Sequence, residues 1–121
     1  MAREAQAIVA LGSNLPASDG APPLVACRRA LAAIAEAVGP LAAHSPWYLS
    51  EPVPASSQPW FVNGVAVSRT SLAPAAVMAA LHGLEEAAGR CRRQRWEARV
   101  LDLDLLAYDD QLWDEGEGGL V

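Results

Sequence analysis

The order of its apolar segments constrains the fold of this 121-residue chain more than any other feature. Short apolar runs predict strands, whereas apolar residues repeated every three to four positions predict amphipathic helices. The order along the chain is strand, helix, strand, strand, helix, strand. The expected strands are residues 7–11, 43–49, 61–68 and 100–108, and the expected helices are residues 24–38 and 74–88. This order predicts an antiparallel sheet with both helices on one face.

Residues at the segment ends support the same arrangement. Pro74 suits the first position of the second helix, Gly89 suits its C-terminal cap, and Gly39 precedes a proline where the first helix should end. These signals predict a split βαβ, ferredoxin-like α+β fold. Since 52% of the residues are hydrophobic, we expect residues 1–121 to form a single domain. The fold does not specify a function, because it hosts enzymes, metal carriers and RNA-binding proteins alike.

Composition excludes several classes of protein. No apolar run approaches the roughly 18 residues that a membrane-spanning helix needs. The apolar run of residues 7–11 is too short for a signal peptide, so we expect a cytoplasmic protein without membrane partners. The two cysteines, Cys27 and Cys91, have no metal-site spacing, and reduced thiols are the expected state of both.

Charge is distributed unevenly along the chain. The net charge is −5 and there is no lysine, yet five of the nine arginines lie within residues 90–99. Seven of the fourteen acidic residues then lie between Asp102 and Glu117. A basic cluster beside an acidic one is typical of a site for a metal-bound polyphosphate. A solvated loop followed by an acidic tail is equally consistent with the charges alone.

The segment around Asp102 and Asp104 carries the sharpest chemical signal. Side chains alternate between the two faces of a strand, so both carboxylates should lie on one face, with their α-carbons about 7 Å apart. Leu101, Leu103 and Leu105 should lie on the opposite face. Two neighbouring carboxylates repel each other unless a cation lies between them, and magnesium binds through one or two carboxylates plus substrate phosphates. The alternative is an acidic face exposed to solvent.

The neighbouring arginines favour the metal–polyphosphate interpretation. The guanidinium group matches phosphate oxygens bidentately and stabilises the charge that develops in phosphoryl transfer. Arginines beside Trp96 are also consistent with RNA binding, although an acidic protein with one basic cluster makes nucleic acid an unexpected partner. The sequence after Gly12 lacks the lysine and glycine spacing of a Walker loop, and His44 and His82 are not spaced as metal ligands.

Taken together, these segments resemble the 6-hydroxymethyl-7,8-dihydropterin pyrophosphokinase family over nearly the whole chain. The most specific stretch combines Trp96 and Arg99 with the Asp-Leu-Asp strand that follows them. The other matching motifs are residues 11–15, 58–63 and 70–74. The resemblance implies transfer of pyrophosphate from ATP to 6-hydroxymethyl-7,8-dihydropterin, with release of AMP, in folate biosynthesis. We therefore expect an enzyme that uses ATP, the pterin and two magnesium ions, and that is a monomer.

The resemblance also implies roles for individual residues. Asp102 and Asp104 would bind the two magnesium ions, and Arg90 and Arg99 would steady the transferred group as catalytic residues. The implied nucleotide-binding residues are Met78, His82, Glu85, Arg92, Arg95, Trp96 and Leu105. The implied pterin-binding residues are Ser50, Val53, Phe61 and Asn63. In this scheme Phe61 stacks on the pterin ring, Asn63 bonds its polar edge, and the arginine-rich loop closes over ATP.

Three departures from the family pattern leave alternatives open. Glu97-Ala98 stands where the family usually has Gly-Pro, and Glu51 replaces a usual proline. The sequence ends at Val121, before a family segment whose later arginine and phenylalanine positions contact ATP and the pterin. One alternative is a shortened relative that binds nucleotide or pterin but turns over poorly. Another is a ferredoxin-like module that binds RNA or a protein partner.

Overall fold

The computed structural model describes residues 4–16, 19–51, 59–89, 100–114 and 119–120. Within these residues it contains two helices and seven strands. The elements are β1 (Ala5–Ser13), α1 (Pro23–Ala37), β2 (Leu41–His44), β3 (Tyr48–Ser50), β4 (Phe61–Thr70), α2 (Pro74–Ala87), β5 (Asp102–Tyr108), β6 (Gln111–Asp114) and β7 (Gly119–Leu120). None of the described helices is long and apolar enough to cross a membrane.

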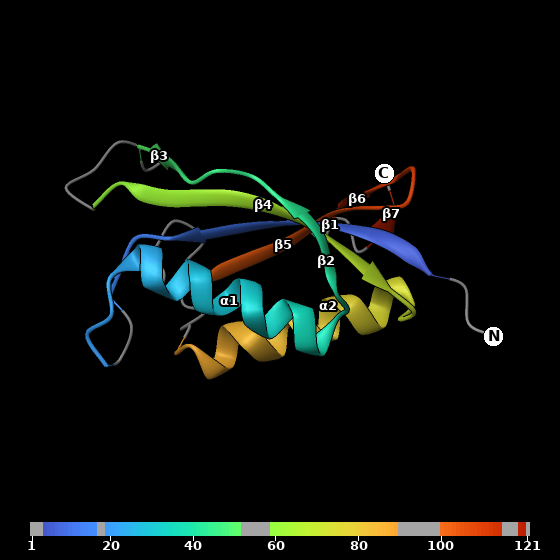
Figure 1. The fold of residues 1–121 in the computed structure, drawn as a ribbon, viewed down its shortest axis with the longest axis horizontal. Helices are drawn as coiled ribbons and strands as arrows, with labels where there is room; N and C mark the ends of the chain where they lie inside the picture. The colour runs from blue at the N-terminus through green and yellow to red at the C-terminus, as the bar shows by residue number, and fades with distance from the viewer. Residues whose placement is uncertain (1–3, 17–18, 52–58, 90–99, 115–118, 121) are drawn as a thin grey trace.

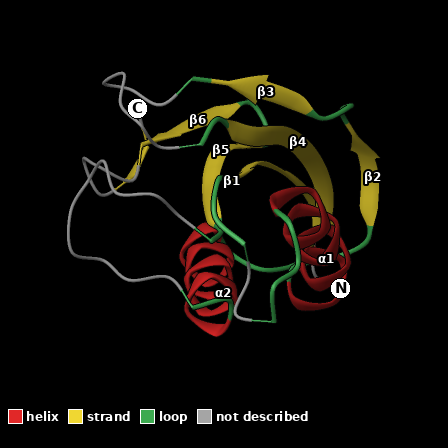
Figure 2. Cartoon of the chain, turned by 90° about the vertical axis from the view of Figure 1, so that its left-hand side faces the viewer, coloured by secondary structure: helices red, strands yellow, loops and turns green. Residues whose placement is uncertain are grey.

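The sheet confirms the predicted ferredoxin-like α+β fold. Its strand order is β2-β4-β1-β5-β6-β7, and β3 also pairs with β4. The central strand β1 runs antiparallel to both of its neighbours, β4 and β5. Both described helices cover the same face of the curved sheet (Figures 1 and 2).

The core lies between the helices and the sheet. The buried side chains come from alternate positions of β1 and β5 and from one side of each helix, and they include Leu11, Ile34, Leu81 and Leu103. Cys27 belongs to this layer as a free thiol, and burial raises its pKa to about 11. Its thiol is therefore protonated at neutral pH. Cys91 lies outside the described residues.

The expected single strand over residues 43–49 was wrong, because the structure divides it into β2 and β3. Pro46 has no backbone N–H to donate to a sheet ladder. Beside it, the Ser45 hydroxyl accepts a hydrogen bond from the Val65 amide at 2.9 Å. The Trp47 ring lies over Gly64, where an added Cβ would come within 2.6 Å of a ring carbon. The chain therefore leaves the ladder at residues 45–47 and rejoins β4 further along.

The end of α1 is joined closely to β4. The Thr70 hydroxyl donates to the Val38 carbonyl at 2.7 Å, and the Ser68 hydroxyl donates to the Gly39 carbonyl at 2.7 Å. The Arg69 amide donates to the carbonyl of Pro40, the residue after Gly39, at 2.8 Å. Three consecutive carbonyls after the helix are thus satisfied by three consecutive residues of β4, which fixes the helix against the sheet.

Candidate functional site

The predicted carboxylate pair lies at the start of β5. Asp102 and Asp104 are half-buried, whereas Leu103 and Leu105 between and after them are at most 1% exposed. The burial alternates along the strand as expected, so both carboxylates lie on the face of the sheet opposite α1 and α2. Each of them interacts with a partner in the structure.

Three of the four predicted pterin residues lie at the start of β4 (Phe61 and Asn63) and on β3 (Ser50). Asn63 donates from Nδ2 to the Ser50 hydroxyl at 2.6 Å. Ser50 is opposite Phe61 in the β3–β4 ladder, and Tyr48 is opposite Asn63. Residues that lie opposite each other in an antiparallel ladder share a face. Ser50, Phe61 and Asn63 therefore form one cluster at the edge of the sheet.

The central strand β1 connects the two groups. Gly12 pairs with Asn63 on one side and with Asp102 on the other. Two residues earlier, Ala10 pairs with Val65 and with Asp104. The carboxylate pair and the pterin residues thus occupy the same face and the same end of the sheet, which is the end that faces the viewer in Figure 2.

Asn14, which follows β1, fixes the segment that leads into β4. Its side chain is 1% exposed, and Nδ2 donates to the Pro59 carbonyl at 3.0 Å. This contact joins two segments 45 residues apart and fixes the chain just before Phe61. The residue roles inferred from the sequence did not include Asn14. The sequence feature that could have identified Asn14 is its position directly after a buried strand. A polar side chain buried there needs a hydrogen-bond partner.

Glu85 on α2 contacts the opposite edge of β5. It is completely buried, and its Oε2 accepts a hydrogen bond from the Leu103 amide at 2.8 Å. In the described part of the chain, β6 pairs with β5 only at Ala107 and Tyr108, so the carboxylate takes the place of a neighbouring strand beside Leu103. Since Leu103 lies between the two aspartates, this bond fixes the backbone that carries the carboxylate pair.

Three of the predicted nucleotide-binding residues form a stripe on α2. Met78, His82 and Glu85 are four and three residues apart, which places them on one side of a helix. Because Glu85 reaches β5, this stripe faces the edge of that strand. Met78 and His82 are half-buried. The Leu105 side chain belongs to the core, which leaves only its main chain for a ligand contact.

Several predicted site residues lie outside the described part of the chain, and the structure does not test their roles. They are Val53, Arg90, Arg92, Arg95, Trp96 and Arg99.

Removing the Glu85 carboxylate should destabilise the protein. In Glu85→Leu the Leu103 amide loses its buried acceptor, and we expect the free energy of unfolding to fall by about 1–3 kcal/mol. Glu85→Gln keeps an oxygen acceptor and should lose less. Urea unfolding of the three proteins measures both changes. Equal stability of the Leu and Gln variants would show that the bond to Leu103 contributes nothing measurable.

The donor set on β5 suits a magnesium ion that also binds phosphate. No group of three or more histidine, cysteine or acidic side chains able to hold a metal occurs among the described residues. Two carboxylates are nevertheless the usual protein contribution where magnesium binds through substrate phosphates and water. The Asp102 and Asp104 carboxylates are therefore chemically compatible with magnesium.

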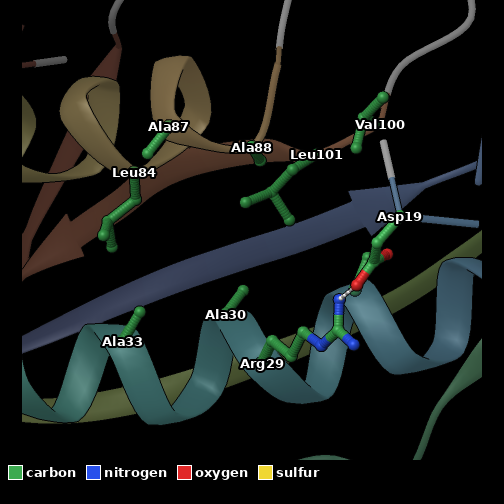
Figure 3. A pocket seen from close by; sticks show the side chains of 10 residues that line it. Asp19, Arg29, Ala30, Ala33, Leu84, Ala87, Ala88, Val100 and Leu101 are labelled. Atoms are coloured by element: carbon green, nitrogen blue, oxygen red, sulfur yellow. Dashed lines mark hydrogen bonds and ion pairs between the residues drawn. The ribbon is translucent and has the colours of Figure 1, made fainter. Parts of the chain in front are cut away.

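A separate cavity of about 320 Å³ lies on the helix side of the sheet (Figure 3). It is lined mainly by alanine and leucine side chains of the two helices, and the described residues around it include none of the predicted site residues. At its rim Arg29 and Asp19 form an exposed ion pair of 2.9 Å. A hydrogen bond from the Ala21 amide, and then the bond from Arg29, hold the pKa of the Asp19 carboxyl below its usual value. The described residues that line this cavity thus lie on the helix side of the sheet, whereas Asp102 and Asp104 lie on the opposite face.

Comparisons with known proteins identify relatives of this sequence. Residues 8–120 match the family described as 7,8-dihydro-6-hydroxymethylpterin-pyrophosphokinase. The 2-amino-4-hydroxy-6-hydroxymethyldihydropteridine pyrophosphokinase of Pseudomonas aeruginosa is 45% identical over 106 residues, covering 88% of this chain and 63% of that relative. The Pseudomonas putida protein of the same name is 38% identical over 111 residues, covering 91% and 88% of the two chains. The Haemophilus influenzae protein of that name is 37% identical over 107 residues, covering 88% and 64%. This chain thus matches slightly less than two thirds of the first and third of these relatives.

Proposed function

The chain belongs to the 7,8-dihydro-6-hydroxymethylpterin-pyrophosphokinase family, and from this premise we propose that it transfers pyrophosphate from ATP to 6-hydroxymethyl-7,8-dihydropterin. One observation supports this most directly. Asn63 and Asp102, from the two groups of predicted ligand-binding residues, flank Gly12 in a single row across the sheet. The proposed site for the acceptor therefore lies beside the proposed site for the metal-bound donor.

The proposed reaction joins the hydroxymethyl oxygen of the pterin to the β-phosphorus of ATP. The bond between that phosphorus and the oxygen bridging to the α-phosphate breaks, AMP leaves, and the hydroxyl proton is released. Such a transfer depends on positioning and on neutralisation of charge, and it needs no protein nucleophile. The sheet provides positioning by fixing both groups of side chains on rigid strands.

Asp102 and Asp104 are the proposed ligands of magnesium. When bound, magnesium would neutralise phosphate charge and orient the polyphosphate. The protein contributes two carboxylates whose backbone is fixed on one side by β1 and on the other by Glu85. Arg90 and Arg99 are proposed to steady the transferred group, and both precede β5 closely in the sequence.

The pterin pocket is proposed at Ser50, Val53, Phe61 and Asn63. Because the Asn63 Nδ2 donates to Ser50, its Oδ1 is left to accept from an N–H of the pterin edge. The half-buried Phe61 ring can cover one face of the bicyclic ring system. Asn14 keeps the chain before Phe61 in place through the Pro59 carbonyl.

The nucleotide is proposed to lie along the outer edge of β5. Met78, His82 and Glu85 are proposed to contribute to this site from α2, and Leu105 is proposed to contribute main-chain atoms. Arg92, Arg95 and Trp96 are proposed to close over ATP from the segment between α2 and β5. We further propose that the enzyme is a cytoplasmic monomer. The family match does not favour the RNA-binding alternative.

Direct assay of the purified protein tests the proposal. The protein is mixed with ATP, magnesium and 6-hydroxymethyl-7,8-dihydropterin, and both AMP and the pyrophosphorylated pterin are quantified. We expect the two products in equal amounts, and neither in reactions lacking the pterin or the metal. AMP formed equally without the pterin would indicate hydrolysis instead of transfer. Absence of both products would reject the proposed function for this chain.

A further inference from the structure

The shared row of Asn63, Gly12 and Asp102 contains a residue without a side chain at its centre. Neighbouring strands lie about 4.8 Å apart, so the α-carbons of Asn63 and Asp102 are about 10 Å apart across β1. Their side chains rise from the same face of the sheet. Between them lies the Gly12 backbone, which is buried by its neighbours. Ligands held by Asn63 and by Asp102 would therefore approach each other directly above Gly12.

A side chain at position 12 would enter this space. An added Cβ would lie 3.2 Å from the Asn63 Oδ1 and 3.8 Å from a carbon of the Phe61 ring. The third nearest atom, the Val62 carbonyl oxygen at 3.8 Å, also belongs to β4. The methyl group would thus contact the proposed pterin residues first. It would also occupy space between these residues and Asp102. In the neighbouring row, Ala10 shows that a methyl group is accommodated on this face of β1 when Val65 is its partner.

We infer that Gly12 marks the point where the pterin hydroxymethyl group meets the polyphosphate, and that its missing side chain makes this approach possible. The inference rests on the proposed function and deepens it, because it assigns a positioning role to Gly12 near the end of β1. Each ligand alone can be bound by the residues on its own side of Gly12. Only the complex with both ligands requires that no side chain at residue 12 widens the separation between Asn63 and Asp102.

Binding measurements on Gly12→Ala and Gly12→Val test this point. The pterin is titrated into the protein alone and into the protein saturated with magnesium and a non-hydrolysable ATP analogue. For Gly12→Ala we expect the fall in pterin affinity to be at least about tenfold larger with the analogue than without it, where only the contact of the methyl group with Asn63 Oδ1 acts. Gly12→Val should show a larger difference. Affinity for the magnesium–analogue complex alone should stay within about twofold of wild type, which also shows that the variants are folded.

Turnover provides a second measurement. We expect kcat to fall at least about tenfold in Gly12→Ala, with little change in the KM for ATP. The matched control is Gly83→Ala, because nothing lies within 4 Å of the Cβ added at that exposed helical position. Gly83→Ala should bind and react as wild type does.

Different results would overturn the inference. Equal weakening of pterin binding with and without the analogue would mean that residue 12 acts only through the Asn63 pocket. Unchanged binding and turnover in folded Gly12→Val would mean that the ligands meet elsewhere. Failure of the wild-type protein to form AMP and product would reject the proposed function itself. An active wild type with unaffected Gly12 variants would reject only the role of Gly12.

Discussion

Asp102→Asn is expected to lower pyrophosphate transfer at least about 100-fold while leaving the protein folded, and Asp104→Asn should behave similarly. Each change removes one negative charge from the proposed magnesium ligands and keeps the size of the side chain. A metal that neutralises phosphate charge stabilises such a transition state by several kcal/mol. A loss of about 2.7 kcal/mol of this stabilisation lowers the rate 100-fold. Both aspartates lie on the face opposite the core, so the hydrophobic packing of β5 should persist.

Calorimetric titration of magnesium–ATP into each variant separates binding from turnover. We expect affinity for magnesium–ATP to fall in both variants, and the thermal midpoint to move by only a few degrees. Asp110→Asn, in the exposed turn between β5 and β6, is the matched control and should leave binding and turnover unchanged. Full activity in either Asp102→Asn or Asp104→Asn would show that the metal assignment is wrong.

The carboxylate pair was predictable because its signal is local. Alternation of leucine and aspartate along the segment specifies a strand with one buried and one polar face, whatever its neighbours are. The same holds for the two helices, whose apolar stripes and end signals lie within their own segments. Proline at 46 was equally visible in the sequence, yet the division of β2 from β3 also depends on Val65 and Gly64 of another strand.

The position of Gly12 could not be predicted in the same way. Its placement between Asn63 and Asp102 depends on the register of two ladders, and a slip of one residue would put it on the other face. Glu85 shows the same limit. Helical spacing placed it on a stripe with His82, but its bond to the Leu103 amide arises only from the packing of α2 beside β5. Contacts between distant segments therefore had to come from the structure.

Gly39→Ala should lower the free energy of unfolding by at least about 3 kcal/mol, a larger loss than that expected for Glu85→Leu. Gly39 lies where the chain leaves α1 and passes β4. A Cβ at this position would be 1.8 Å from the Arg69 carbonyl oxygen and 2.8 Å from the Arg69 carbonyl carbon. These are backbone atoms of a paired strand, so no rotation of a side chain relieves the overlap. The backbone must shift, and the bonds from Ser68 and Thr70 to the same turn would be strained or lost.

Urea unfolding of Gly39→Ala, with Gly83→Ala as the control, measures this effect. Both variants make the same chemical change, but Gly83 has open space around its added Cβ and lies within α2. Alanine is favoured over glycine inside a helix by up to about 1 kcal/mol, so Gly83→Ala should be as stable as wild type or slightly more stable. Equal stability of the two variants would mean that the turn after α1 can move away from β4 at little cost. The predicted difference between them instead attributes the loss to the contact with Arg69, since the lost flexibility of glycine in the unfolded chain is common to both.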